Sequence, residues 1–293
     1  MDAGDLSVFA AVAEAGGINR AAQSLNTVQS NVTQRIRLLE RELGVPLFFR
    51  HSRGVTLTPA GLQLLPYAER IGQLIGEARR AATNGAAPAG RLAVGSLETT
   101  AARRLPPLLS AYAAEFPAVD IVLETGTTAE LVTKVVERRL EGAFVAGPVD
   151  HADLAAEPIV EEELVFLTAP GAPTLGTLLR RAARGEVALK ILVLRAGCSY
   201  RQRLEQFLAE RGLKDLRRLE FGTVDGIVGC VGAGIGVTMM PRAIVEQPLR
   251  QGRVAAHALP PRAARVTTLF VRRRDAFVST ALQRFLERAR QLV

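Results

Sequence analysis

Cysteine, histidine, lysine and tryptophan are scarce or missing in this chain. It has two cysteines, three histidines and no tryptophan in 293 residues. Cys198 and Cys230 form no paired CxxC motif, which excludes a disulfide scaffold and fits a reducing compartment. No GxSxG, HExxH or P-loop motif occurs, so the usual patterns for nucleophilic, zinc and phosphate chemistry are missing. We therefore predict a protein that is not an enzyme and that holds no metal or cofactor.

Long apolar runs and a basic leader are also absent. The longest stretch without a charge, residues 226–241, has 16 residues, and five of them are glycine. A membrane-spanning helix needs about 20 apolar residues, so this run is too short. The first residues, MDAGDLSVFAAVAEAGG, carry Asp2, Asp5 and Glu14 and no basic residue, unlike a secretion signal. These features predict a cytoplasmic protein that does not associate with membranes.

Basic residues, in contrast, are abundant. The net charge of +8 rests on 37 basic residues, of which 34 are Arg. Heavy Arg usage can reflect codon bias alone, but a basic chain also tolerates a nucleic acid as its partner. A chain of 293 residues is too long for one ordinary core and predicts two or three units. The uncharged segment NGAAPAG at 84–90 is typical of a linker between such units.

Three helices are expected near the N-terminus. Apolar residues at 6–13 recur at helical spacing, and a Gly-Gly pair at 16–17 ends that helix. A short helix is expected at Asn19–Leu25, with Asn19 as its N-cap. Thr27 is the expected N-cap of a longer helix at 28–43, which a glycine terminates. A short helix, a tight turn and a longer helix form the helix-turn-helix pattern.

The longer helix is amphipathic. Its expected inner stripe consists of Val28, Val32, Ile36, Leu39 and Leu43. Its polar face suits a major groove, because Gln can pair with adenine and Arg with guanine. The candidate DNA contacts on this face are Gln29, Ser30, Asn31, Thr33, Gln34 and Arg37. No acidic residue occurs at 15–39, as a phosphate-facing surface requires, although a solvated face in a helix bundle remains the alternative explanation.

The segment PLFFRHSRGVTL at 46–57 predicts a hairpin. Two short apolar strands flank HSRG, and a Thr-Pro pair then opens the next helix. Arg50, His51 and Arg53 would lie at the tip, where Arg can reach the DNA backbone or the minor groove. Arg50 and Arg53 are therefore candidate DNA contacts, whereas His51 is better explained as a surface residue.

The segments AAQSL, VQSNVTQRIRLLERELGVPLF and LTPAG, in this order, resemble the winged helix-turn-helix of LysR-type transcriptional regulators. The resemblance implies double-stranded promoter DNA as the partner, with RNA polymerase as a further partner. It also implies that Gln29, Ser30, Thr33 and Gln34 face the bases and that Arg53 is the wing contact. The residues at 28–33 depart from the usual Ser-Gln-Pro or Ser-Gln-Ser start, so the binding mode transfers but the operator sequence does not.

Residues 58–84 are expected to form one long helix. Its apolar stripe consists of Leu62, Leu65, Ile71, Leu74, Ile75 and Ala78. A single exposed helix of this kind needs a partner, and Pro66 should bend it because the ring removes a hydrogen bond. The resemblance implies a dimerisation helix, so that a homodimer or homotetramer presents two recognition helices to two half-sites. Packing of the stripe against its own unit is the alternative.

Strand-like and helical runs alternate beyond residue 90. The expected strands are 91–96, 119–125, 142–147, 164–169, 190–195 and 266–271, and the expected helices are 101–116, 128–141, 174–184, 200–211, 225–234 and 275–292. Such alternation predicts an α/β fold with parallel sheets. The segments LPPLLSAYAAEFPAVDIVLETG at 105–126 and VGAGIGVTMMP at 231–241 resemble the type II periplasmic-binding-protein-like effector domain of LysR-type regulators.

The expected architecture has three parts. An all-α winged helix-turn-helix occupies 1–58, a linker helix with a hinge occupies 59–90, and a two-lobed α/β domain occupies 91–293. Lobe I is expected to comprise 91–164 and 266–293, and lobe II 165–265. A solute-binding protein for transport would share the two lobes, but it would need a secretion signal and would have no use for the helix-turn-helix.

Ligands of such folds bind between the lobes, at strand ends and helix N-termini, where unpaired N–H groups favour anions. The expected effector-binding residues are Ser96, Thr99, Thr100, Thr127, Thr128, Gly147, Cys198, Ser199, Arg201, Thr223 and Val224. Hydroxyl groups gathered from separate loops suit a small carboxylate or another polar metabolite. Helix capping by each Ser or Thr is the alternative explanation.

Cys198 offers a different mode of control. It lies beside Arg195 and Arg201, whose charges would lower the pKa of its thiol and make it a redox sensor. The resemblance to the LysR family covers essentially the whole chain, and the peroxide-sensing branch of that family has a cysteine in a comparable loop. Cys230, however, lies 32 residues further on in an apolar run, which favours an inert thiol lining the cleft.

Overall fold

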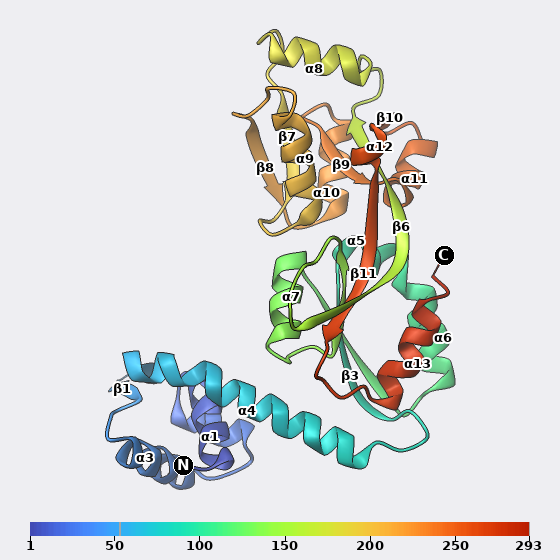
Figure 1. The fold of residues 1–293 in the computed structure, drawn as a ribbon. Helices are drawn as coiled ribbons and strands as arrows, with labels where there is room; N and C mark the ends of the chain where they lie inside the picture. The colour runs from blue at the N-terminus through green and yellow to red at the C-terminus, as the bar shows by residue number, and fades with distance from the viewer. Residues whose placement is uncertain (53, 293) are drawn as a thin grey trace. The chain divides into compact units, whose positions relative to one another are not determined.

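The computed structural model describes residues 1–52 and 54–292 (Figure 1). It divides into two compact units, Met1–Thr83 and Asn84–Val293. The predicted wing contact Arg53 lies outside the described residues. None of the helices in the described part combines the length and the apolar character that a membrane crossing requires.

The first unit opens with α1 (Ala3–Ala15), α2 (Ile18–Ser24) and α3 (Gln29–Leu43). A capping box starts α1, with the Asp5 amide donating to Asp2 Oδ1 at 2.7 Å. Two predicted caps are wrong, because α2 begins after Gly17 and α3 begins after Val28. The Thr27 hydroxyl accepts a hydrogen bond from Asn31 Nδ2 at 3.0 Å, and among the described residues no side chain caps the first turn of α3.

The core of this unit forms where α3 packs against α1 and α2. Val32, Ile36 and Leu39 are buried there. The other two residues of the predicted stripe are not, since Val28 is 64% exposed and Leu43 is 37% exposed. Val28 precedes the helix and Leu43 lies in its last turn, so neither is positioned to reach the core. The packed stripe is therefore about two turns long, and the rest of α3 faces solvent.

The wing is an antiparallel hairpin of β1 (Phe48–His51) and β2 (Gly54–Leu57). It is attached to the end of α1, because the Val55 amide donates to the Gly16 carbonyl at 3.2 Å. Gly54 has φ of +138°, and a Cβ there would lie 2.4 Å from the Gly16 oxygen. Only glycine fits this contact without displacing the backbone.

The long helix α4 (Pro59–Thr83) follows the wing and packs on α1. Its N-terminal half supplies buried Gly61 and Ala68 to the core, with Leu64, Leu65 and Ile71 partly buried beside them. Four large apolar residues of the helix remain exposed within this chain: Leu62, Tyr67, Leu74 and Ile75. Pro66 lies inside the helix, as predicted.

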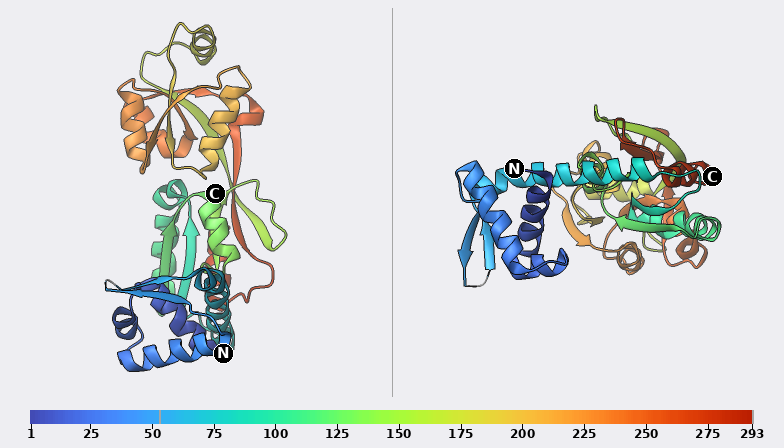
Figure 2. Two further views of the ribbon diagram at one scale, coloured as in Figure 1. Left: turned by 90° about the vertical axis from the view of Figure 1, so that its left-hand side faces the viewer. Right: turned by 90° about the horizontal axis from the view of Figure 1, so that it is seen from below.

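The second unit is built on a seven-stranded sheet. Its order is β10-β6-β11-β5-β3-β4, with β9 also paired to β6. The strands β3 (Gly90–Ser96), β4 (Val119–Thr125) and β5 (Gly142–Ala146) are parallel, whereas β6 (Leu154–Thr168) and β11 (Arg265–Arg273) are antiparallel to each other. Figures 1 and 2 show β6 and β11 running together from one lobe into the other.

Lobe I surrounds β3, β4 and β5. Its helices are α5 (Glu98–Arg103), α6 (Leu105–Glu115), α7 (Thr128–Val136) and α13 (Thr280–Ala289). The predicted helix 101–116 is thus two helices, which meet at Arg104. Phe144 and Phe270 pack edge to face in the core with centroids 5.0 Å apart, and Phe285 lies against Phe144. Burying each such side chain contributes about 1.5–3 kcal/mol.

Lobe II contains the remaining strands, β7 (Lys190–Leu194), β8 (Arg217–Phe221), β9 (Thr238–Pro241) and β10 (Ala255–Ala258). Its helices are α8 (Leu175–Ala183), α9 (Ser199–Ala209), α10 (Val224–Gly232), α11 (Arg242–Arg250) and α12 (Pro261–Ala264). Of these elements β8, β9, β10, α11 and α12 were not expected. The pair β7–β8 is parallel, as predicted for an α/β lobe.

Candidate nucleic-acid interface and ligand cleft

The polar face of α3 is open to solvent. The candidate contacts Gln29, Ser30, Asn31, Gln34 and Arg37 are exposed, and Thr33 is half-buried. Arg35, in contrast, is held away from this face, because its guanidinium pairs with Asp5 at 2.9 Å and with Asp2 at 3.2 Å. The polar and basic side chains of the face are thus available to a partner, while Asp2 and Asp5 at the start of α1 are engaged by Arg35.

The wing adds one further candidate. Arg50 is exposed on β1, and its Nη2 lies 3.6 Å from Glu40 Oε2. Glu40 also accepts the Leu47 amide at 2.8 Å, so this carboxylate links the end of α3 to the wing. Arg50 therefore reaches a phosphate only by leaving or sharing Glu40, whose carboxylate keeps the Leu47 amide as a partner in either case.

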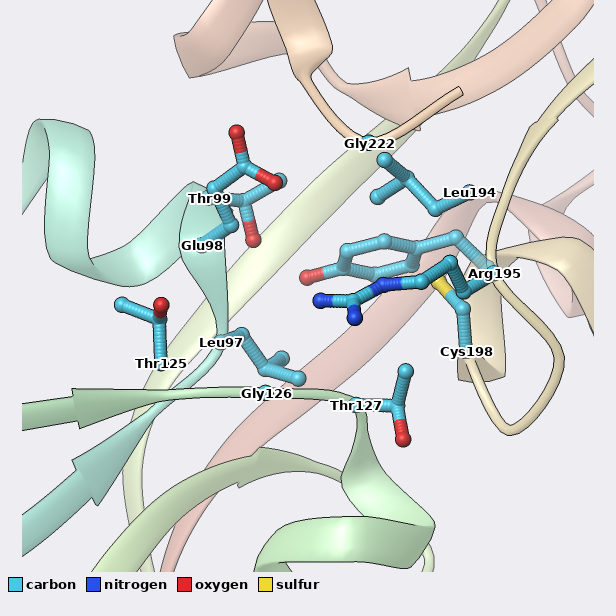
Figure 3. A pocket seen from close by; sticks show the side chains of 11 residues that line it. Leu97, Glu98, Thr99, Thr125, Gly126, Thr127, Leu194, Arg195, Cys198 and Gly222 are labelled. Atoms are coloured by element: carbon cyan, nitrogen blue, oxygen red, sulfur yellow. The ribbon is translucent and has the colours of Figure 1, made fainter. Parts of the chain in front are cut away.

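The second unit contains a cleft between the lobes. Its lining comes from the ends of four strands, β3, β4, β7 and β8, and from the starts of the following helices (Figure 3). The lining residues are Leu97, Glu98, Thr99, Thr125, Gly126, Thr127, Leu194, Arg195, Cys198, Tyr200 and Gly222. Three predicted effector residues are among them: Thr99, Thr127 and Cys198.

Other predicted effector residues do not line this cleft. Ser96 is buried and donates to the Leu97 carbonyl, and Thr100 is buried in α5. Arg201 pairs with Glu205 and Glu220, and it lines a smaller cavity of about 10 Å³. Thr223 caps α10 by accepting from the Gly226 amide, the capping role that was the alternative explanation.

The remaining predicted residues join the lobes to each other. The Ser199 hydroxyl donates to Thr128 Oγ1 at 2.9 Å. The Gly147 carbonyl accepts from Arg203 Nη2 at 2.8 Å, and the Val224 amide donates to Glu98 Oε1 at 3.3 Å. Together with an ion pair between Arg103 and Glu246 at 3.2 Å, these bonds hold the lobes close.

The closed cleft is small. It encloses about 40 Å³, whereas ligand sites usually measure about 300–1,000 Å³. A metabolite therefore enters only if the lobes move apart and some of the bonds between them break.

Sequence reasoning missed the two charged residues of the cleft, Glu98 and Arg195. Both lie within two residues of a strand end, where side chains of an α/β fold reach a ligand site, and this position was the signal that could have identified them. Arg195 is exposed and comes one residue after β7. Glu98 is half-buried at the first position of α5.

Cys198 differs from the redox prediction. Its side chain is buried, and burial raises the pKa of its thiol, outweighing the nearby Arg201 charge that lowers it. Both Cys198 and Cys230 are free thiols. The expectation of a lowered pKa is thus wrong, because desolvation of the thiolate exceeds the attraction of the guanidinium.

A helix-turn-helix unit with an open polar recognition face, joined to a two-lobed α/β unit with a ligand cleft, defines a ligand-responsive transcription regulator. Two family descriptions match the chain. Residues 4–62 match the bacterial regulatory helix-turn-helix protein of the lysR family, and residues 85–293 match the LysR substrate binding domain. The chain belongs to the LysR family and is a transcriptional regulator with an effector-binding domain.

Individual relatives agree with this assignment. The HTH-type transcriptional regulator GltR of Bacillus subtilis strain 168 is 42% identical over 97% of this chain and 95% of its own length. The regulator YofA of Bacillus velezensis is 41% identical over 98% of this chain and 96% of its own length. The structure of full-length CbnR complexed with its target DNA aligns over 100% of both chains with a TM-score of 0.68 and 25% identity.

Proposed function

We propose that this protein binds promoter DNA as a homodimer or homotetramer in the cytoplasm and that a small effector in the inter-lobe cleft controls its action on RNA polymerase. The observation that carries the proposal is the exposed polar face of α3 at residues 29–37, where no acidic residue occurs. Its Gln and Arg side chains suit base edges, and the uncapped first turn of α3 leaves N–H groups for phosphate. In this proposal residues 1–58 bind DNA, with Arg53 as the wing contact. Residues 59–90 form the linker and dimerisation helix with its hinge, and residues 91–293 bind the effector.

A gel-shift experiment with the chain's own upstream region tests DNA binding. Gln29→Ala and Arg37→Ala should each weaken specific binding by about 1–3 kcal/mol. Gln63→Ala and Arg70→Ala remove the same side chains from exposed positions of α4 and serve as matched controls. Equal affinity in all four variants, or no preference of the native protein for the upstream duplex over random competitor, would contradict the proposal.

Effector control requires the cleft to change shape. A ligand that binds the open form better shifts the population toward it and changes the angle between lobes, or between subunits. Bonds between the lobes, such as Ser199–Thr128 and Arg103–Glu246, are the contacts that this change must break or remake. Small-angle scattering of the DNA complex with and without effector should give different profiles; identical profiles would count against this mode of control.

A further inference from the structure

Two opposite charges and one buried threonine hydroxyl line the inter-lobe cleft. Glu98 belongs to lobe I and Arg195 to lobe II, and both side chains are drawn in the cleft in Figure 3. They form no ion pair with each other in the part of the chain that the structure describes. Thr99, which is 3% exposed, also lines the cleft, and its Oγ1 forms no hydrogen bond of good geometry within the described residues. Its hydroxyl lies near that of Tyr200 and lowers the pKa of that phenol against the larger, opposite effect of burial. A polar group of a ligand would complete the hydrogen bonding of Thr99.

Glu98 occupies the place where an anionic ligand would be expected. The N-terminus of α10 favours a negative group, and Glu98 Oε1 already accepts the Val224 amide there at 3.3 Å. The second oxygen, Oε2, has no donor among the described residues. A carboxylate only accepts hydrogen bonds, so the ligand group beside Glu98 must be a donor, and a positive one binds best.

Arg195 provides the complementary position. Its guanidinium takes part in no hydrogen bond or ion pair among the described residues. The carboxylate that its charge influences is Glu130, whose pKa is lowered first by the Thr127 amide and, to a smaller extent, by Arg195. Glu130 is already engaged in capping α7. The guanidinium group of Arg195 is therefore available to a ligand carboxylate, which it can bind through two parallel hydrogen bonds.

We infer that the effector is a small zwitterion of the amino-acid class, with its ammonium group at Glu98 and its carboxylate at Arg195. This inference rests on the proposed effector function of the cleft. Thr99 Oγ1 then provides a further polar contact inside the cleft. A dicarboxylate, by contrast, would place its second negative group against Glu98 and would have to displace that side chain from α10.

Thermal shift and calorimetry on the full-length protein test the inference. The probes are the twenty standard L-amino acids, each with its deaminated carboxylic acid and its decarboxylated amine. At least one amino acid should raise the melting temperature. Its deaminated and decarboxylated analogues should each bind at least about tenfold more weakly than the amino acid itself. A panel in which no amino acid binds, or in which a deaminated acid binds as tightly as its parent, would overturn the inference.

Variants assign the two ends of the ligand. Glu98→Gln should weaken the amino acid about tenfold and leave the deaminated acid unaffected or tighter, whereas Arg195→Gln should weaken both. Glu210→Gln and Arg184→Gln change exposed residues outside the cleft lining and should leave binding unchanged. Unchanged affinity in Glu98→Gln would overturn the assignment. Gel shifts with the same preparations separate the two failures, because DNA binding that persists without amino-acid binding contradicts only this inference.

Discussion

At the scale of single residues, the wing depends on two glycines that meet at one point. Gly54 has φ of +138°, and its backbone lies against the Gly16 carbonyl. Gly54→Ala should lower the unfolding free energy of the first unit by about 1–3 kcal/mol, because the new Cβ meets backbone and the conformation is strained. Gly44→Ala is the matched control, since Gly44 also has positive φ, +71°, but has open space around it.

Chemical denaturation followed by circular dichroism measures this difference. Gly44→Ala should cost about 1 kcal/mol from backbone strain alone. The Gly54 variant should also lose DNA affinity, because the wing is displaced from α1. A Gly54→Ala protein as stable as Gly44→Ala would show that the contact with Gly16 adjusts freely.

The thiols give a second prediction at this scale. Burial raises the pKa of Cys198, and Cys230 is only half-buried, so iodoacetamide at neutral pH should modify Cys230 first. The raised pKa means that the folded protein favours the neutral thiol, so any thiolate reactivity of Cys198 should rise only under alkaline conditions. Mass spectrometry after timed labelling measures both rates. Faster modification of Cys198, or loss of DNA binding in peroxide that Cys198→Ser prevents, would restore the redox interpretation.

At the scale of elements, regular amphipathic segments could be predicted from the sequence and mixed ones could not. The helix at 28–43 and the strand at 119–125 were identifiable because their apolar residues recur at helical spacing or form a short apolar run. The strand β6 was expected at 164–169 and runs from Leu154 to Thr168. The part that was not expected, residues 154–163, contains a proline and the run Glu161–Glu163, which resemble a loop.

Those three acids are compatible with a strand because other elements neutralise them. Glu161 pairs with Arg265 at 3.0 Å, Glu162 with Arg104 at 3.1 Å, and Glu163 with Arg242 at 3.0 Å. Tertiary pairing thus overrides the low strand propensity of the segment. Tertiary structure also explains why the cleft was predicted only in part. The sequence shows which hydroxyl groups follow strands, but how the lobes pack decides which of these groups face the ligand and which face the opposite lobe.

The end of β11 provides a pH-dependent prediction. Arg273 is held against Asp275 at 2.7 Å, and this hydrogen bond lowers the pKa of the Asp275 carboxyl. Since the folded pKa lies below the unfolded value of about 3.9, the contribution to stability is complete above that value and is lost as the pH falls through the folded pKa. Asp275→Asn should therefore lower the melting temperature at pH 7, by the equivalent of about 1 kcal/mol or less for this exposed carboxylate.

The difference between wild type and Asp275→Asn should shrink as the pH falls below about 4. Differential scanning calorimetry across pH 3 to 7 follows it. Asp215→Asn, an exposed loop residue, is the control and should show no pH-dependent difference. A difference in melting temperature between wild type and Asp275→Asn that stays constant with pH would mean that the substitution acts through packing rather than through charge.

At the scale of the whole molecule, we expect the apolar residues of α4 that stay exposed within one chain to determine assembly. Leu74 and Ile75 are each 41% exposed in a single chain, and neither belongs to the core of the first unit. Leu74→Glu or Ile75→Glu should raise the dimer dissociation constant about tenfold or more, because a charge would be buried at the proposed interface. Sedimentation velocity measures this, with Gln63→Glu as the control on the same helix. Unchanged assembly in both variants would place the dimer contact elsewhere.

The way the chain enters and leaves lobe II has an engineering consequence. Glu163 of β6 and Arg265 of β11 pair directly with each other. The segment between them, residues 164–264, therefore leaves and rejoins these two strands at neighbouring positions. Residues 164–264 are in effect an insertion between two strands that already pair with each other in lobe I. Exchanging this segment between relatives, with the junctions at Glu163 and Arg265, should transfer the side of the cleft that contains Arg195 and keep the strand order of lobe I. Such exchanges are a route to regulators with a new ligand preference.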